Sequence, residues 1–176
     1  DLGRAIVKVS AVAEENRRIR APARVFQSQE AFLAAFKGGT LNQDVVVVVS
    51  HQGPKSNGMP ELHKLTPYLG ILQNKGFKVA MLTDGRMSGA SGKVLSAIHV
   101  TPEACADGPI SQIENNDIVI IDAERGLLEV EAVLANREFK TTDSTMHESG
   151  MGRELFVSFR RGVGPAESGA TIFELS

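Results

Sequence analysis

The sequence predicts a single mixed α/β domain with a strong β component. Residues 44–50 and 78–83 are apolar and rich in β-branched side chains, which is typical of strands buried on both faces. Segments with helical apolar spacing lie between the strand-like segments. With 176 residues, of which 42% are hydrophobic, the chain is long enough to bury a core of its own.

The first forty residues are predicted to contain a strand, a loop and a helix. Residues 7–11 alternate between apolar and polar side chains, which is the period of a half-buried strand. Residues 14–24 are polar and rich in arginine, and they are predicted to form a solvated loop. Ser28 is predicted to cap a helix that ends at Gly38 and Gly39.

The middle of the chain is predicted to hold a second helix between the two buried strands. Residues 51–58 contain glycine and proline and are expected to be a loop. Pro60 suits the first turn of the helix, Pro67 should kink or restart it, and Gly76 should close it. The leucines with helical spacing are Leu62, Leu65, Leu69 and Leu72.

Residues 94–100 are apolar and fit a strand or a short helix. Residues 118–121 and 127–130 flank a turn at residues 123–126, which predicts a hairpin. A helix is predicted for residues 153–161, with Leu155, Phe156 and Phe159 on its apolar side.

Composition excludes several classes of function. The formal net charge of −2 gives no electrostatic reason to expect binding to nucleic acid or to an anionic membrane. The longest aliphatic run, residues 45–49, is far shorter than the roughly 18 residues of a membrane span. Cys105 is the only cysteine, so we expect a reducing compartment, and one thiol cannot hold an iron–sulfur cluster. Since residue 1 is not Met, we expect a piece of a longer protein.

Two glycine-rich loops, residues 51–61 and 83–93, follow the two most strand-like segments. Loops at the carboxyl ends of strands are where α/β proteins usually bind ligands. Neither loop fits the dinucleotide, P-loop or nucleophile-elbow pattern. The histidines lack metal-ligand spacing, so the residues predict a ligand site without defining its chemistry.

Several side chains in the two loops have both a structural and a chemical interpretation. Glu61 falls in the predicted first helical turn, where capping is the simpler role and metal binding the alternative. Ser88 is either a turn former or a catalytic group. Asp84 is expected to cap the turn after its strand, with Arg86 as its ion-pair partner. Cys105 is expected to be a small buried apolar residue rather than a reactive thiol.

Lys55, Ser56 and Asn57 precede the predicted helix N-terminus. This position is a reasonable anion cradle, because backbone N–H groups point outward there. All three are also ordinary loop residues, so the interpretation as a substrate contact stays open at this point.

Motifs throughout the chain resemble the dihydroxy-acid/6-phosphogluconate dehydratase family. They occur in the family's order: GMPE at residues 58–61, TDGRMSG at 83–89, HVTPEA at 99–104, GPI at 108–110 and DIVIID at 117–122. Further segments resemble the branch that acts on 6-phosphogluconate: LGRA at 2–5, KVSAV at 8–12, HQGPKSN at 51–57, GMGRELF at 150–156 and SGAT at 168–171. The resemblance covers essentially the whole chain.

The resemblance implies an architecture and a set of partners. Family proteins are much longer, so residues 1–176 are expected to be their C-terminal part, a swivelling β/β/α domain with a barrel-like β core flanked by helices. The absent N-terminal part is expected to hold a 4Fe–4S cluster, with no cluster ligand in this chain. A homodimer is expected for the full-length protein, in the cytoplasm.

The resemblance also implies a reaction, the dehydration of 6-phospho-D-gluconate to 2-keto-3-deoxy-6-phosphogluconate in the Entner–Doudoroff pathway. By motif position, Ser88 is the base that takes the C2 proton, while cluster iron acts as Lewis acid on the departing C3 hydroxyl. Glu61 is a ligand of Mg²⁺, which holds the substrate carboxylate. The residues expected to contact substrate or to stabilise the serine alkoxide are Lys55, Ser56, Asn57, Arg86 and Lys93.

Two alternatives remain. The parent enzyme is instead a dihydroxy-acid or aldonic-acid dehydratase, which a comparison of phosphorylated and unphosphorylated substrates would show. Alternatively, this domain is not catalytic and only packs on its partner domain, which an exposed apolar face would favour.

Overall fold

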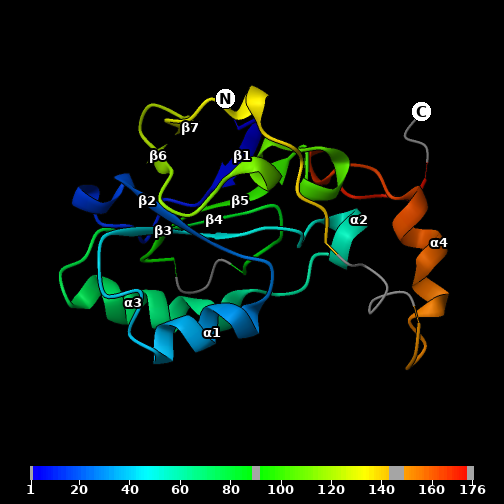
Figure 1. Cartoon of the computed structure of the whole chain (residues 1–176), viewed down its shortest axis with the longest axis horizontal. Helices are drawn as coiled ribbons and strands as arrows, with labels where there is room; N and C mark the ends of the chain where they lie inside the picture. The colour runs from blue at the N-terminus through cyan, green and yellow to red at the C-terminus, as the bar shows by residue number, and fades with distance from the viewer. Residues whose placement is uncertain (1, 89–91, 143–148, 174–176) are drawn as a thin grey trace.

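A computed structural model of the chain describes residues 2–88, 92–142 and 149–173 (Figure 1). Its centre is a seven-stranded mixed sheet, nearly closed into a barrel, with the strand order β1-β5-β4-β3-β2-β6-β7. The strands are β1 (Arg4–Val7), β2 (Arg18–Phe26), β3 (Val45–Val49), β4 (Val79–Thr83), β5 (Leu95–Thr101), β6 (Ile118–Asp122) and β7 (Leu127–Val130). The α-helices of the described residues are α1 (Gln29–Lys37), α2 (Pro54–Asn57), α3 (Thr66–Asn74) and α4 (Glu154–Gly162).

The middle of the sheet is parallel and its two edges are antiparallel. Strands β2, β3, β4 and β5 are parallel to one another. Strand β1 is antiparallel to β5, and the β6–β7 hairpin extends the other edge through an antiparallel pairing of β6 with β2. The predicted α/β class with a strong β component is therefore confirmed, as is the hairpin. Of the two structures that fit residues 94–100, the strand is the one that forms, as β5.

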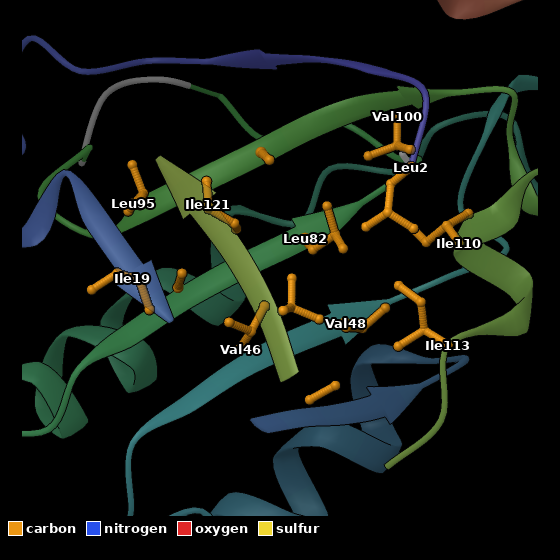
Figure 2. Close-up of a cluster of buried hydrophobic side chains, with 14 of the residues drawn as sticks. Leu2, Ile19, Val46, Val48, Leu82, Leu95, Val100, Ile110, Ile113 and Ile121 are labelled. Atoms are coloured by element: carbon orange, nitrogen blue, oxygen red, sulfur yellow. The ribbon is translucent and has the colours of Figure 1, made fainter. Parts of the chain in front are cut away.

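Strand β3 is the clearest example of a strand buried on both faces. All five of its valines are buried. Val46 and Val48 belong to one apolar cluster with Ile121 of β6, and Figure 2 shows β6 crossing over the strands of the sheet that face it. This crossing is where the sheet curls back on itself, which gives the barrel-like core.

The opposite face of β3 packs against helices. Val45, Val47 and Val49 lie in a second apolar cluster, together with Phe32 of α1 and Leu69 of α3. Figure 1 shows both helices along the same side of the sheet. Helix α1 begins as predicted, because the Ser28 hydroxyl oxygen accepts a hydrogen bond from Ala31 N at 3.1 Å. The arrangement of helices outside a β core is confirmed.

The prediction of a solvated loop for residues 14–24 is wrong. Most of this segment belongs to β2, which pairs with both β3 and β6 inside the sheet. Ala21 and Ala23 are buried, whereas Arg18 and Arg20 are exposed. The strand period is present in the sequence, but alanine contributes little apolar signal, and the arginines therefore dominated the prediction.

The helix predicted from Pro60 onward is also corrected. Residues 54–57, expected to be a loop, form the one-turn helix α2, and the longer helix α3 begins only at Thr66. Pro67 lies in the first turn of α3, where a missing N–H costs nothing, so it starts this helix rather than kinking an earlier one. The first strand likewise ends at Val7 instead of continuing to residue 11.

Helix α4 forms as predicted, but its apolar side stays largely exposed. Leu155 is 72% exposed, Phe156 58% and Phe159 48%. The helix contacts α2. The segment that follows it is joined to β1 by an ion pair of 3.5 Å between Glu167 and Arg4. No helix in the described parts of the chain has the length and hydropathy needed to cross a membrane.

Candidate active site

The two loops singled out in the sequence meet next to the sheet. Strands β3 and β4 are parallel neighbours, so the loops that leave their carboxyl ends start at the same edge. Glu61 and Arg86 form an isolated parallel bridge, and Leu62 N donates a hydrogen bond to Arg86 O at 3.1 Å. Backbone contacts therefore hold residues 59–62 beside residues 84–88.

The carboxylate of Glu61 is held by backbone groups from both sides. Its Oε1 accepts hydrogen bonds from Ser88 N at 2.7 Å and from His63 N at 3.0 Å. Its Oε2 lies 3.7 Å from an Nη of Arg86, and the side chain is 35% exposed. Glu61 thus lies in a bridge rather than in the first turn of a helix, although its bond to His63 N still caps the short turn His63–Leu65.

The guanidinium of Arg86 lies between the two loops. Its Nε donates to Met59 O at 2.8 Å, and it forms its ion pair with Glu61 rather than with Asp84, the predicted partner. The prediction of an Asp84–Arg86 pair is wrong because Asp84 is buried and Arg86 is exposed. Arg86 remains a positive charge beside Glu61 and Ser88.

Asp84 connects three segments beneath the loops. Its Oδ1 accepts a hydrogen bond from Gln52 N, and its Oδ2 accepts one from Ala104 N, both at 2.9 Å. Burial raises the pKa of Asp84 above the usual value for aspartic acid, and the two backbone hydrogen bonds oppose that rise. The adjacent Gly85 is packed so tightly that a Cβ would lie 2.7 Å from Gln52 Cβ. These contacts of Asp84 and Gly85 fix the position at which the loop leaves β4.

Helix α2 is tied to the fold by a buried carboxylate that the sequence interpretation missed. The backbone N–H groups of Lys55 and Ser56 donate to the carboxylate of Glu103 over 3.0–3.2 Å. A Cβ at Gly53 would lie 2.2 Å from Glu103 Oε2, so only glycine fits there. The backbone anion cradle predicted for this segment is therefore corrected, because it holds an internal carboxylate. The only sequence signal for this contact is that Glu103 is the acidic residue of the HVTPEA motif.

The side chains of this segment are divided between structure and solvent. The Ser56 hydroxyl donates to His51 O at 3.0 Å, and the Asn57 amide donates to Gln52 Oε1 at 3.0 Å. Lys55 is exposed. Any contact of these three residues with a substrate stays a prediction.

Ser88 lies at the exposed end of the described loop. Its backbone is fixed by Glu61, and the residue itself is open to solvent. Gly89, the last residue of the TDGRMSG motif, lies outside the described residues. Lys93 is placed elsewhere: its Nζ donates to Asn74 Oδ1 at 3.1 Å, at the end of α3. The structure thus brings Glu61, Arg86 and Ser88 together, and it gives Lys93 a separate partner.

Cys105 is exposed, which corrects the expectation that it is buried. Its Sγ lies 3.4 Å from Glu103 Oε2. Local desolvation of the sulfur and the Glu103 charge raise the pKa of this thiol to about 12. The thiol is therefore protonated at neutral pH, as expected for a group that is not reactive.

The carboxylate of Glu61 suits a hard cation such as Mg²⁺. One oxygen is fixed by two N–H groups, and the other faces outward beside Arg86. Within the described residues, no three His, Cys, Asp or Glu side chains are grouped to hold a metal ion. In the part of the chain that the structure describes, Glu61 thus offers one fixed carboxylate, which fits an ion whose remaining positions are filled by water, substrate or another domain. An iron–sulfur cluster does not fit, because the only thiol is that of Cys105.

Comparisons with known proteins identify the family of this chain. Residues 1–170 match the family model "Dihydroxy-acid/6-phosphogluconate dehydratase C-terminal". Phosphogluconate dehydratase of Rhizobium meliloti is 55% identical over 175 residues, which is 98% of this chain and 29% of that protein. The Escherichia coli K12 protein of the same name is 53% identical over 174 residues, 97% of this chain and 29% of the relative.

A dihydroxy-acid dehydratase of Agathobacter rectalis is 44% identical over 140 residues, 77% of this chain and 24% of that protein. The chain spans less than a third of the length of these curated relatives. The family match extends from the strands of the core to the loops that carry Glu61 and Ser88. The chain therefore belongs to the dihydroxy-acid/6-phosphogluconate dehydratase family and corresponds to its C-terminal domain.

Proposed function

We propose that this chain is the C-terminal part of a hydro-lyase that dehydrates 6-phospho-D-gluconate to 2-keto-3-deoxy-6-phosphogluconate and water. The observation that carries the proposal is the hydrogen bond of 2.7 Å between Ser88 N and Glu61 Oε1, which joins two motifs that are 27 residues apart. The similarity to proteins named phosphogluconate dehydratase over 97–98% of the chain supports the choice of substrate. The reaction belongs to the Entner–Doudoroff pathway, in the cytoplasm.

In this proposal, Ser88 removes the proton from C2 of the substrate. Its backbone is anchored to Glu61, while the exposed residue leaves its hydroxyl accessible to a ligand. A serine hydroxyl is a weak acid, so its alkoxide needs positive charge nearby. Arg86 is suited to supply part of it, since its guanidinium lies beside the carboxylate that anchors Ser88.

Glu61 is the residue of this chain that would hold Mg²⁺. When bound, the ion would supply charge that orients the substrate carboxylate and makes the C2 proton more acidic. The two N–H groups on Oε1 fix the carboxylate in advance, so Oε2 needs little reorganisation to act as a ligand. Arg86 balances the negative charge of this oxygen until a cation approaches.

The other parts of the active site lie outside this chain in our proposal. The family's iron–sulfur cluster would be held by the N-terminal part of the protein, because a single thiol cannot hold it. Among the proposed substrate contacts, Arg86 has the strongest support because it lies beside Glu61. Lys93 has less support, since its ammonium group binds Asn74. Lys55, Ser56 and Asn57 are retained as proposed contacts near the Glu61 loop.

The proposal is tested with the full-length parent protein, reconstituted anaerobically with iron, sulfide and Mg²⁺. We expect keto acid from 6-phosphogluconate with the parent and none with residues 1–176 alone. If the parent acts only on unphosphorylated dihydroxy acids, the proposed substrate is wrong and the family assignment still holds. The 44% identity to a dihydroxy-acid dehydratase makes that the second candidate function.

A parent that is inactive on both classes of substrate would favour the third interpretation, a domain that only packs on its partner domain. The exposed apolar side of α4 is the feature that suits this interpretation. Self-association of the isolated chain, measured by sedimentation, would then depend on Leu155 and Phe159.

A further inference from the structure

A groove of about 550 Å³ lies between α2 and α4, next to the loop that carries Glu61. Gly58 and Met59 form part of its lining on one side. Helix α4 and the residue before it supply the other side, with Arg153, Phe156, Phe159 and Arg160. Neither the proposed base nor the proposed metal ligand lines this groove, so its contents are a separate question.

The chemistry of the groove suits a compact anion. Two guanidinium groups line it, and the described lining residues include no carboxylate. Arg153 and Arg160 are seven positions apart, so they share one side of the helix. Arginine also matches phosphate oxygens with two parallel hydrogen bonds.

The groove adjoins the candidate active site through Met59 and through Asn57, one of the proposed substrate contacts. Met59 lines the groove, and its carbonyl oxygen accepts the 2.8 Å hydrogen bond from Arg86 Nε. Arg86 in turn pairs with Glu61. The groove and the candidate active site are therefore neighbours, connected through Met59 and Arg86.

We infer that this groove binds the phosphate group of the substrate, with Arg153 and Arg160 as its ligands. The inference rests on the proposed function and adds the basis of its specificity for a phosphate monoester. It also gives a role to the GMGRELF segment, whose arginine is Arg153. The backbone N–H groups of Lys55 and Ser56 are another candidate for the phosphate site, but they already donate hydrogen bonds to the carboxylate of Glu103.

The test uses the full-length parent protein with Arg153→Ala, Arg153→Lys and Arg160→Gln. The matched control is Arg161→Ala, because Arg161 lies on the same helix but does not line the groove. We measure the KM for 6-phosphogluconate and the inhibition constants of inorganic phosphate and of unphosphorylated gluconate. Circular dichroism and iron content show that each variant is folded and loaded.

We expect Arg153→Ala and Arg160→Gln to raise the KM for 6-phosphogluconate at least about ten-fold, the usual cost of a lost charged hydrogen bond. The inhibition constant of inorganic phosphate should rise by a similar factor, and that of gluconate should stay within about two-fold. Arg153→Lys should fall between wild type and Arg153→Ala, because lysine keeps the charge but not the paired geometry.

Two results would overturn the inference. One is a wild-type KM in both charge-removing variants. The other is an equal weakening of 6-phosphogluconate and gluconate, which would show a structural role for α4 rather than phosphate binding. A wild-type parent that does not convert 6-phosphogluconate would instead reject the proposed function, so the two failures are distinguishable.

Discussion

At the scale of single residues, Glu61 shows how the backbone prepares a side chain for chemistry. Two N–H groups, from His63 and Ser88, fix Oε1 without help from a ligand. The amide oxygen of glutamine can accept the same hydrogen bonds, whereas its neutral side chain is a poorer ligand for Mg²⁺. A Glu61→Gln exchange therefore keeps the position of the side chain and removes only its negative charge.

We predict that Glu61→Gln in the full-length parent raises the Mg²⁺ concentration for half-maximal activity at least about ten-fold. A metal titration of the dehydration rate measures this. Glu131→Gln is the control, since Glu131 is also a carboxylate paired with an arginine, but on the segment after β7. An unchanged titration for Glu61→Gln would remove Glu61 as a metal ligand.

Asp84 has a structural rather than a catalytic role. Removing its carboxylate leaves the N–H groups of Gln52 and Ala104 without their acceptors in a buried place. Each such loss costs about 1–3 kcal/mol, so we predict that Asp84→Ala lowers the free energy of unfolding by about 2–6 kcal/mol. Urea unfolding of residues 1–176 measures it. A loss below about 0.5 kcal/mol would contradict the proposed role of Asp84 as the anchor of the loop.

The ion pair of Asp117 with Arg137 predicts a dependence of stability on pH. The hydrogen bonds from Arg137 hold the pKa of Asp117 below its usual value. Because the pKa is lowered in the folded state, the pair stabilises the fold above the ordinary carboxyl pKa, and this contribution is lost as the pH falls through the lowered one. The urea midpoints of wild type and Arg137→Ala should therefore differ at pH 7 and approach each other in strong acid. A difference that is the same at both pH values would contradict this account.

At the scale of elements, burial divides the chain into a rigid sheet and an outlying helix. Every residue of β3 and β4 is buried, whereas no residue of α4 is. Local opening costs least where few apolar contacts are lost, so α4 should open far more easily than the strands. We predict that backbone amides of α4 exchange with deuterium at least about 100-fold faster than those of β3 in the isolated chain. Mass spectrometry of peptic fragments measures this, and similar protection in both elements would contradict it.

Elements also show what could be predicted from sequence. The unbroken valines of β3 and the Ser28 cap of α1 are strong local signals, and both predictions are confirmed. Strand β2 was missed because Ala21 and Ala23 supply its buried side with little apolar signal. The predicted start of helix α3 lies too early in the chain. Pro60 and Pro67 both suit a first helical turn, and only packing distinguishes them.

At the scale of the whole molecule, the candidate site is a product of topology. The loops that carry Glu61 and Ser88 were recognisable in the sequence, and adjacent parallel strands bring them to one edge. The Glu61–Arg86 bridge and the buried Glu103 under α2 were not predictable, because each depends on contacts between distant segments. Local patterns contain no information about such contacts, so only the fold reveals them.

The most direct test of the central claim is the activity of Ser88→Ala in the full-length parent, reconstituted with iron, sulfide and Mg²⁺. Alanine keeps the backbone N–H that binds Glu61, so this substitution removes only the hydroxyl. We predict normal folding and iron content, with a rate of keto-acid formation from 6-phosphogluconate at least about 10³-fold below wild type. A rate near that of wild type would show that Ser88 is not the base and that these loops do not form the catalytic half of the site.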